Sequence, residues 1–413
     1  MKLKKMISII CSLALSVSML SACSSDDSST KSGSSAPVSD SQTSSENSEA
    51  ASSEEDKEMA NTYALTSENV KLVGRTWLNE DALWLALSGS GIDFEYTGKK
   101  LDITVLGDGA ASGGIDNQAR IAFYVDGERV VDEMVNSPEE TFTVFESAEA
   151  KTVNVKVIKL SECAMSTCGI KAITVAEGET IKPAAAKSHT IEFIGDSITC
   201  GYGVDDEVKE HHFSTSTEDV TKAYAYKTAQ ALDADYSMFS ISGYGIISGY
   251  TTGSTPVKEQ TIPQYYESLG FSYNSFANTT KPHTLEWDFE SFKPEVIVIN
   301  LGTNDASYTN ILKERKQEYA DGYKAFLKQV RENNPDATIF CTLGTMDNRL
   351  CEKLMETVIE YTAETGDENV HYMMFDLQDG ANDGYAADWH PTEATHQKAA
   401  DKLVNEIKTV MGW

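Results

Sequence analysis

The sequence predicts two domains of different fold class: an all-β sandwich over residues 63–183 and an α/β domain with a parallel sheet over residues 187–413. In the first region, apolar and polar residues alternate with a period of two between glycine-rich turns, which is typical of a β-sandwich. In the second, apolar strand-like runs alternate with segments of helical periodicity, which indicates helices covering both faces of a parallel sheet. The Ala-rich stretch over residues 182–187 separates the two patterns.

Short alternating runs in the first region are expected to form the strands of the sandwich. These runs are Leu83–Leu87, Ile92–Tyr96, Leu101–Leu106, Ile121–Val125 and Val153–Ile158. Turn residues separate them, as in the Ser-Gly-Ser-Gly stretch over residues 88–91 and in Asp126-Gly127. The region shows no clear amphipathic helix pattern, so we expect β-structure throughout.

Apolar runs in the second region are expected to be buried parallel strands. They are Thr190–Ile194, Ser237–Ile241, Val296–Leu301, Thr338–Leu343 and Tyr372–Phe375. Helical periodicity predicts helices over Ala223–Leu232, Leu312–Arg331 and Leu350–Glu364, and a last helix with Leu403 and Ile407 on one face. Ligands of such folds bind at the carboxyl ends of the strands, so we expect functional residues in the segments that follow the strands.

The N-terminal residues indicate export from the cytoplasm. Lysines at positions 2, 4 and 5 precede a short apolar run that ends in Leu20-Ser21-Ala22-Cys23. This pattern is typical of a secretory signal over residues 1–22, and the run is too short for a membrane span. The residues before Cys23 resemble a bacterial lipobox, which implies lipidation of this cysteine; the alternative is an ordinary signal peptide with a chance cysteine. Residues 23–62 are mostly Ser, Asp and Glu, so we expect a disordered tether.

Charge and cysteine content exclude some partners and sites. The chain of 413 residues carries a formal net charge of −30, which repels nucleic acid. Five of the seven cysteines lie beyond the proposed lipidation site, and an odd number cannot be fully paired. Cys163 and Cys168 are close enough for a local disulfide, with reduced core thiols as the alternative. No pair has Cys-x-x-Cys spacing, so we expect no metal site.

Four short motifs of the second region have residue types suited to acyl transfer. They are Gly195-Asp196-Ser197, Ser242-Gly243-Tyr244-Gly245, Gly302-Thr303-Asn304-Asp305 and Asp388-Trp389-His390-Pro391, the first three following predicted strands. A serine hydroxyl becomes a good nucleophile when a base takes its proton, and histidine is the base suited to neutral pH. The N–H groups of Ser197 and Gly243 and the side-chain amide of Asn304 would stabilise the developing oxyanion.

Taken together and in this order, the four motifs resemble those of the SGNH (GDSL) hydrolase family. The β-region adds Gly74-Arg75, a Ser-Gly-Ser-Gly-Ile stretch over residues 88–92 and a Tyr-Val-Asp-Gly stretch over residues 124–127, which are similar to the two-domain acetyl esterases of carbohydrate esterase family 2. The resemblance covers the chain from about Val73 to the C-terminus. It implies a flavodoxin-like α/β/α sandwich preceded by a jelly-roll-like β-domain.

The resemblance also implies roles for individual residues. Ser197 would be the nucleophile, His390 the base, and Gly243 and Asn304 would complete the oxyanion hole. The family usually has an Asp three residues before the histidine, whereas this chain has alanine there and Asp388 two residues before it. Either the Asp388 side chain orients His390, or a backbone carbonyl near residues 387–388 accepts a hydrogen bond from its Nδ1–H. The second arrangement, which we favour, is a Ser–His dyad that keeps the tautomer with less stabilisation of the imidazolium.

Aromatic residues beside the motifs are candidates for contact with sugar rings. Trp389 adjoins the proposed base and is expected to form a wall of the substrate site; Tyr202 and Tyr244 have the same potential, with core packing as the alternative.

Other polar side chains near the motifs have structural interpretations. Asp196 and Asp305 are expected to tie loops together by accepting backbone N–H bonds. His211 and His212 are interpreted as part of a solvated loop rather than as metal ligands, and His396 as a polar surface residue of the last helix.

The sequence therefore predicts a serine esterase that removes O-acetyl groups from carbohydrate of the xylan or mannan type, without a cofactor. It would act outside the cytoplasm, held to the bacterial membrane only through the lipid on Cys23. A lipase-like or thioesterase activity of the same family is an alternative that requires a deep apolar acyl cavity. A carbohydrate-binding lipoprotein with a vestigial esterase domain is another.

Overall fold

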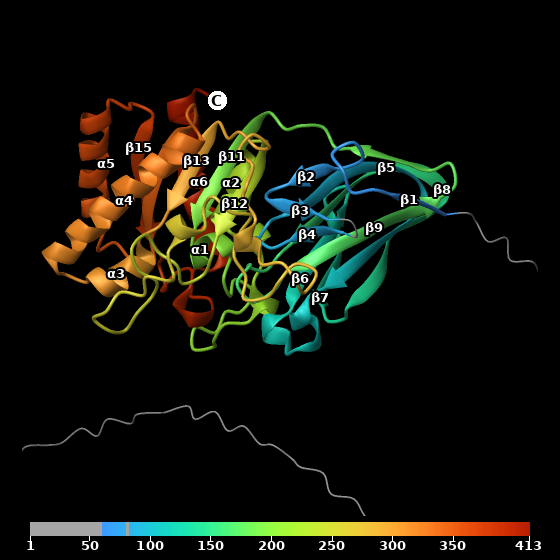
Figure 1. Ribbon diagram of the computed structural model, residues 1–413, viewed down its shortest axis with the longest axis horizontal. Coiled ribbons are helices and arrows are strands. Elements are labelled where there is room, and N and C mark those ends of the chain that lie inside the picture. The colour runs from blue at the N-terminus through green and yellow to red at the C-terminus, as the bar shows by residue number, and fades with distance from the viewer. Residues whose placement is uncertain (1–59, 80–81) are drawn as a thin grey trace, which may run out of the picture. The chain divides into compact units, whose positions relative to one another are not determined.

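The computed structural model describes residues 60–79 and 82–413 (Figure 1). The expected signal peptide, Cys23 and the tether up to residue 59 lie outside the described residues. The described chain has an antiparallel β-region followed by a parallel sheet flanked by helices, which confirms the predicted fold class. Within this part of the chain, no helix has the length and apolar character needed to cross a bilayer.

The β-region is an antiparallel sheet of ten strands. The strands are Ala60–Tyr63 (β1), Lys71–Val73 (β2), Thr76–Leu78 (β3), Leu83–Leu85 (β4), Gly91–Gly107 (β5), Ala119–Val125 (β6), Glu128–Val135 (β7), Glu139–Lys159 (β8), Cys168–Ala176 (β9) and Thr180–Pro183 (β10). They run in the order β3-β4-β9-β5-β8-β6-β7, with β1 paired to β9 and both β2 and β10 paired to β5. Because β1 begins at Ala60, residues 60–62 belong to this sheet and not to the expected tether.

Strand β5 unites two of the predicted strands. Its buried apolar residues occupy even positions over Ile92–Tyr96 and odd positions over Leu101–Val105. A change of parity would turn the apolar side chains to the wrong face of a regular strand. The pairing of β5 with β8 shifts register between Gly98 and Lys100, so a bulge restores the inward direction and both halves reach one core.

The second region is a five-stranded parallel sheet. Its strands are His189–Gly195 (β11), Ala234–Ser240 (β12), Val296–Asn300 (β13), Thr338–Thr345 (β14) and Val370–Leu377 (β15), in the order β12-β11-β13-β14-β15. The helices are Ser197–Cys200 (α1), Tyr224–Ala231 (α2), Thr303–Thr309 (α3), Lys313–Asn333 (α4), Cys351–Thr365 (α5) and Glu393–Met411 (α6). This strand order is the flavodoxin-like one. All five predicted strands occur, and so do the three helices for which the sequence predicted both ends.

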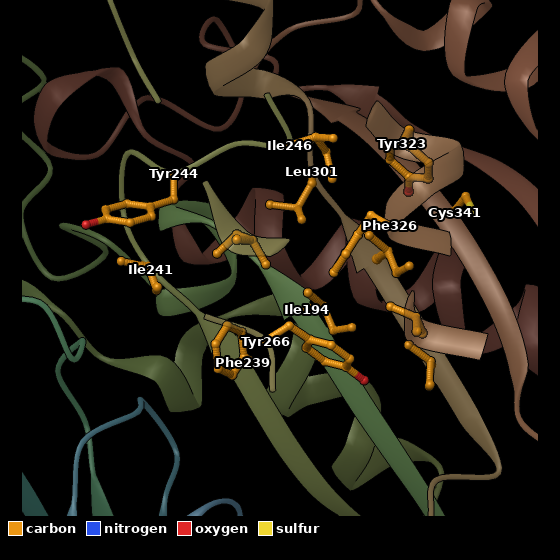
Figure 2. Packing of buried hydrophobic residues seen from close by; sticks show 14 of the residues in the cluster. Ile194, Phe239, Ile241, Tyr244, Ile246, Tyr266, Leu301, Tyr323, Phe326 and Cys341 are labelled. Carbon is orange, nitrogen blue, oxygen red and sulfur yellow. The ribbon is translucent and has the colours of Figure 1, made fainter. Parts of the chain in front are cut away.

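Helices cover both faces of the parallel sheet because its strands are apolar at successive positions. On β13, Val296 and Val298 face one core, where they pack with residues of α2 and α6. The intervening Ile297 and Ile299 face the other core, with residues of α4 and α5. Figure 2 shows part of this second core, where side chains of α4 lie against those of the central strands.

One arginine of the β-region is buried against the parallel sheet. Arg75, between β2 and β3, is 1% exposed and pairs with Glu192 of β11 at 3.0 Å. Its guanidinium also donates to the carbonyls of Tyr266 and Ser268, and four aromatic rings surround it with centroids 4.5–5.4 Å away. The strand that leads to Ser197 is therefore fastened to the β-region by a buried ion pair.

Two sequence expectations about buried side chains are settled by the fold. The five cysteines in the described part are all free and buried, so Cys163 and Cys168 form reduced core thiols and no disulfide. The prediction that His396 lies on the surface is wrong, because this residue is 1% exposed. Its Nδ1 accepts the N–H of Tyr224 at 3.2 Å, and burial lowers its pKa to about 3.

Candidate active site

Ser197 and His390 lie within hydrogen-bond distance. Ser197 is the first residue of α1, directly after β11, where Asp196 caps the helix by accepting the N–H of Ile198. The Nε2 of His390 is 2.9 Å from the Ser197 Oγ, although the two residues are far apart in sequence. Ser197 is 7% exposed, and both residues line the same cavity. The geometry is that of a serine nucleophile paired with a histidine base.

Backbone carbonyls hold the other face of the imidazole. The His390 Nδ1 is 3.2 Å from the carbonyl oxygen of Ala387 and 3.2 Å from that of Asp388. The Asp388 carboxylate points elsewhere: it accepts from the Tyr202 hydroxyl at 2.6 Å and lies 2.9 Å from the Nδ1 of His212. Of the two arrangements that the sequence left open, the structure has the one in which backbone carbonyls, and not the Asp388 side chain, orient His390.

The carbonyls reach His390 because the chain is left-handed at two successive residues. Asp388 has φ 48° and Trp389 has φ 64°. A bulky residue such as tryptophan adopts this conformation only where the surroundings impose it, at a cost of about 1–3 kcal/mol. The contacts of Asp388 with Tyr202 and His212 hold the strained turn on one side.

Burial and ring stacking set the basicity of His390. The ring of Tyr202 stacks on the imidazole with centroids 3.9 Å apart and planes 22° from parallel. Burial lowers the pKa of His390 to about 4. The hydrogen bond from its Nδ1–H to the Ala387 carbonyl and the negative charge of Asp388 raise the pKa, but their effect is smaller than that of burial. His390 is therefore in its neutral, proton-accepting form at neutral pH.

We expect activity to persist to lower pH than an ordinary histidine would allow. A histidine with its usual pKa of about 6.5 loses base function below that pH. Since the folded-state pKa of His390 is about 4, kcat/KM should stay level from pH 7 to 5 and fall only near pH 4. Acetate release measured from pH 3.5 to 8 would show the pH at which kcat/KM falls on the acid side of the profile. Residual activity after return to pH 7 is the control for unfolding. An acid limb centred near 6.5 would contradict the expectation.

Three donors expected for an oxyanion face the cavity. Ser197, Gly243 and Asn304 all line it. Among the described residues, no protein group accepts the N–H of Ser197 or of Gly243. The Asn304 amide donates to the Tyr244 carbonyl at 2.8 Å and, over a long 3.4 Å, to Asp196. Gly243 has φ +81°, where L-residues are strained, and a Cβ there would meet no protein atom, so its backbone is open to a ligand.

One buried carboxylate, that of Asp305, ties two of the loops that carry these donors together, as expected, whereas Asp196 accepts a backbone N–H only within its own helix. Asp305 is fully buried and accepts the N–H groups of Ile246, Ile247 and Ser248, with the shortest bond at 2.8 Å. The loop after β12 is thereby fastened to α3, the helix that carries Asn304.

The cavity over Ser197 has a volume of about 540 Å³. Its walls are Tyr202, Ser242, Gly243, Tyr250, Thr303, Asn304, Ser307, Met346, Asp347, Arg349, Asp388 and Trp389. Trp389 lines it with half of its surface exposed, and Tyr202 lines it from the loop after α1. The expectation for Tyr244 is wrong, because its ring is 2% exposed and packs in the core (Figure 2).

Five lining residues were not singled out from the sequence, namely Tyr250, Ser307, Met346, Asp347 and Arg349. Tyr250 is 61% exposed and lies seven residues after Gly243, and Arg349 follows β14. Their position after strand ends was the available signal. His211 and His212 belong to an exposed loop, as expected, although His212 also contacts Asp388. Within residues 60–79 and 82–413, no group of three or more His, Cys, Asp or Glu side chains could hold a metal ion.

Comparisons with known proteins identify the family of each of the two domains. Residues 193–398 match the GDSL-like lipase/acylhydrolase family, and residues 72–184 match the N-terminal domain of carbohydrate esterase 2. The cellulase/esterase CelE of Acetivibrio thermocellus is 32% identical over 332 residues, which cover 79% of this chain and 38% of that protein. The present chain thus spans well under half of that relative.

Two further comparisons cover nearly the whole of the matched protein. An acetylxylan esterase / glucomannan deacetylase of Cellvibrio japonicus is 24% identical over 355 residues, covering 86% of this chain and 92% of that protein. A family two carbohydrate esterase from Clostridium thermocellum, solved in complex with cellohexaose, is 28% identical with a TM-score of 0.70, covering 83% of this chain and 99% of that one. The chain therefore belongs to the GDSL-like lipase/acylhydrolase family, and in front of that domain it carries the N-terminal domain of carbohydrate esterase family 2.

Proposed function

We propose that this protein is a serine esterase that removes O-acetyl groups from carbohydrate. The His390 imidazole takes the proton of the Ser197 hydroxyl as its oxygen attacks the ester carbonyl. The oxyanion receives hydrogen bonds from the N–H groups of Ser197 and Gly243 and from the Asn304 amide, which gives up its long bond to Asp196. The imidazolium of His390 then donates its proton to the sugar oxygen as the bond between that oxygen and the acyl carbon breaks, so that the sugar leaves as an alcohol and an acetyl-serine remains. Water, deprotonated by His390, releases acetate and restores Ser197.

The lining of the cavity is the observation that favours a sugar ester over a lipid ester. Met346 is the one aliphatic side chain among its lining residues, whereas hydroxyl, amide, charged and aromatic groups form the rest. The apolar part of the wall therefore consists mainly of aromatic rings, and an extended acyl chain would meet one aliphatic side chain there. Aromatic faces such as those of Trp389 and Tyr250 suit stacking on sugar rings. This supports a small acyl group on a carbohydrate of the xylan or mannan type.

We also propose that the protein acts outside the cytoplasm as a lipoprotein. Residues 1–22 would serve as the signal, Cys23 would carry the lipid, and the residues from there to position 59 would supply reach between the membrane and the folded part. The β-domain would occupy residues 60–183, because β1 begins at Ala60, and the hydrolase domain residues 187–413.

Hydrolysis of 4-nitrophenyl acetate and 4-nitrophenyl octanoate by residues 60–413 tests the proposed activity. We expect acetate turnover to exceed octanoate turnover by at least about tenfold, since Met346 is the one aliphatic side chain in the lining against which an extended acyl chain could pack. The Ser197→Ala variant supplies the blank rate. Acetate release from acetylated xylan and acetylated mannan oligosaccharides should depend on Ser197 in the same way.

Other outcomes of this experiment support the rival activities. A preference for octanoate would indicate a lipase-like enzyme. Equal rates for the wild type and Ser197→Ala, together with oligosaccharide binding by both, would indicate a carbohydrate-binding protein with a vestigial esterase domain.

A further inference from the structure

The loop that carries Gly243 receives a hydrogen bond from the β-region. The N–H of Ser242, the residue before Gly243, donates to the Oε2 of Glu162 at 2.9 Å. Glu162 lies in the segment that follows β8, and it is 1% exposed. The hydrogen bond therefore joins the β-region to the backbone beside the proposed oxyanion donor, across 80 residues of sequence.

Glu162 is itself held on its backbone from two sides. The buried ammonium of Lys159 donates to the carbonyl oxygen of Glu162 at 2.7 Å and to that of Ser161 at 2.8 Å. The N–H of Glu162 donates to the Oε2 of Glu218 at 2.9 Å, and Glu218 is fully buried. This arrangement gives the Glu162 carboxyl a fixed place.

The electrostatic setting suits an acceptor beside an oxyanion. Burial raises the pKa of Glu162 and of Glu218, and the nearby charge of Glu162 raises that of Glu218 further. Two close buried carboxyl groups retain protons more readily than isolated ones. The Lys159 ammonium opposes the negative charge that remains.

We propose that Glu162 is a positioning residue of the active site, through which the β-region fixes the Ser242–Gly243 backbone in the conformation that aims the Gly243 N–H into the cavity. The inference rests on the proposed function for its catalytic consequence. Oxyanion donors act because they are already in place before the reaction. A displacement of less than about 1 Å at Gly243 therefore reduces the stabilisation of the transition state more than it reduces the binding of the substrate. The β-region is then part of the catalytic apparatus and more than a neighbouring module.

Variants at position 162 separate positioning from plain stability. Glu162→Ala removes the acceptor, and Glu162→Gln keeps a carbonyl oxygen that can accept the Ser242 N–H. Lys71→Met is the matched control, because the Lys71 Nζ joins the β-region to Asp235 at 2.8 Å, away from the cavity. We expect Glu162→Ala to lower kcat for 4-nitrophenyl acetate by roughly 10- to 100-fold with KM within about twofold. Glu162→Gln should recover most of this loss, and Lys71→Met should keep the wild-type kcat.

Hydrogen exchange tests the inference without relying on activity. Mass-spectrometric exchange should be faster over residues 241–245 in Glu162→Ala than in the wild type, and unchanged there in Lys71→Met. Affinity for methylboronic acid, which forms a tetrahedral adduct with a reactive serine, should fall in parallel with kcat.

Two results would overturn the inference. One is unchanged exchange over residues 241–245 in Glu162→Ala, whatever its activity. The other is a loss of kcat in Glu162→Ala that is matched by both Glu162→Gln and Lys71→Met and follows their loss of melting temperature. Failure of the proposed function would appear separately, as wild-type turnover no faster than that of Ser197→Ala.

Discussion

Replacing His390 by alanine is expected to lower kcat by roughly 10⁴- to 10⁶-fold, as much as replacing Ser197 by alanine. The two side chains act as one unit, because the Oγ cannot attack effectively unless Nε2, 2.9 Å away, takes its proton. The double variant should be no slower than either single one. The residual rate above that of water would come from substrate binding and the oxyanion donors. Active-site titration and kcat measurements on all three variants with an acetyl ester would test this.

Asp388→Asn is the control for the base. Asparagine has the same shape and tolerates the left-handed conformation at this position. Because backbone oxygens hold Nδ1 and the carboxylate does not, this variant should retain kcat to within about tenfold, against a loss of about 10⁴-fold where a carboxylate orients the histidine. A loss of several thousandfold in Asp388→Asn, or additive effects in the Ser197/His390 double variant, would contradict the dyad.

Replacing Arg75 by methionine is expected to lower the free energy of unfolding by about 3–5 kcal/mol. The substitution leaves Glu192 buried without its cation, and it leaves the carbonyls of Tyr266 and Ser268 without their donor. It also removes a cation enclosed by aromatic rings. Chemical unfolding followed by tryptophan fluorescence would measure the loss. Since Arg75 joins the β-region to β11, the variant should also lose cooperativity and unfold in two steps.

Two further variants check the physical reason for this effect. Lys182→Met breaks an exposed pair with Glu95 and should change stability by less than about 0.5 kcal/mol. Combining Arg75→Met with Glu192→Met removes both buried charges, so the double variant should be more stable than Arg75→Met alone. A double variant at least as unstable as the single one would show that packing around Arg75, and not the unpaired Glu192, is responsible.

Periodicity was sufficient to predict the fold because burial repeats along the chain. The runs over β13 and most of β14 are apolar at successive positions, since both faces of the sheet are covered there. Where prediction failed, the determining contact lay outside the local pattern. The runs at Ile92–Tyr96 and Leu101–Leu106 predicted two strands, because a bulge absorbs the parity change between them. His396 was taken for a surface residue although Ala399, Ala400 and Leu403 follow it at helical spacing on the inner face of α6.

Three of the four motifs of the candidate site were predictable from their place directly after strand ends, and the His390 motif from its residue types. Ser197, Gly243, Asn304 and His390 all line one cavity. The orientation of individual side chains was not predictable, since it depends on partners distant in sequence. The ring of Tyr244 turns to the core, and the carboxylate of Asp388 turns to Tyr202 and His212.

Because main-chain oxygens hold His390, the orientation of the base does not depend directly on which side chains stand at positions 387 and 388. Positions 387 and 388 need a particular backbone path, and position 388 needs a residue that tolerates φ 48°. Glycine, asparagine and aspartate meet that need, so a small library at this position could alter substrate preference while the base keeps its alignment. Side chains around the base are therefore free to diversify, in nature or by design, to a degree that a carboxylate-held histidine does not allow.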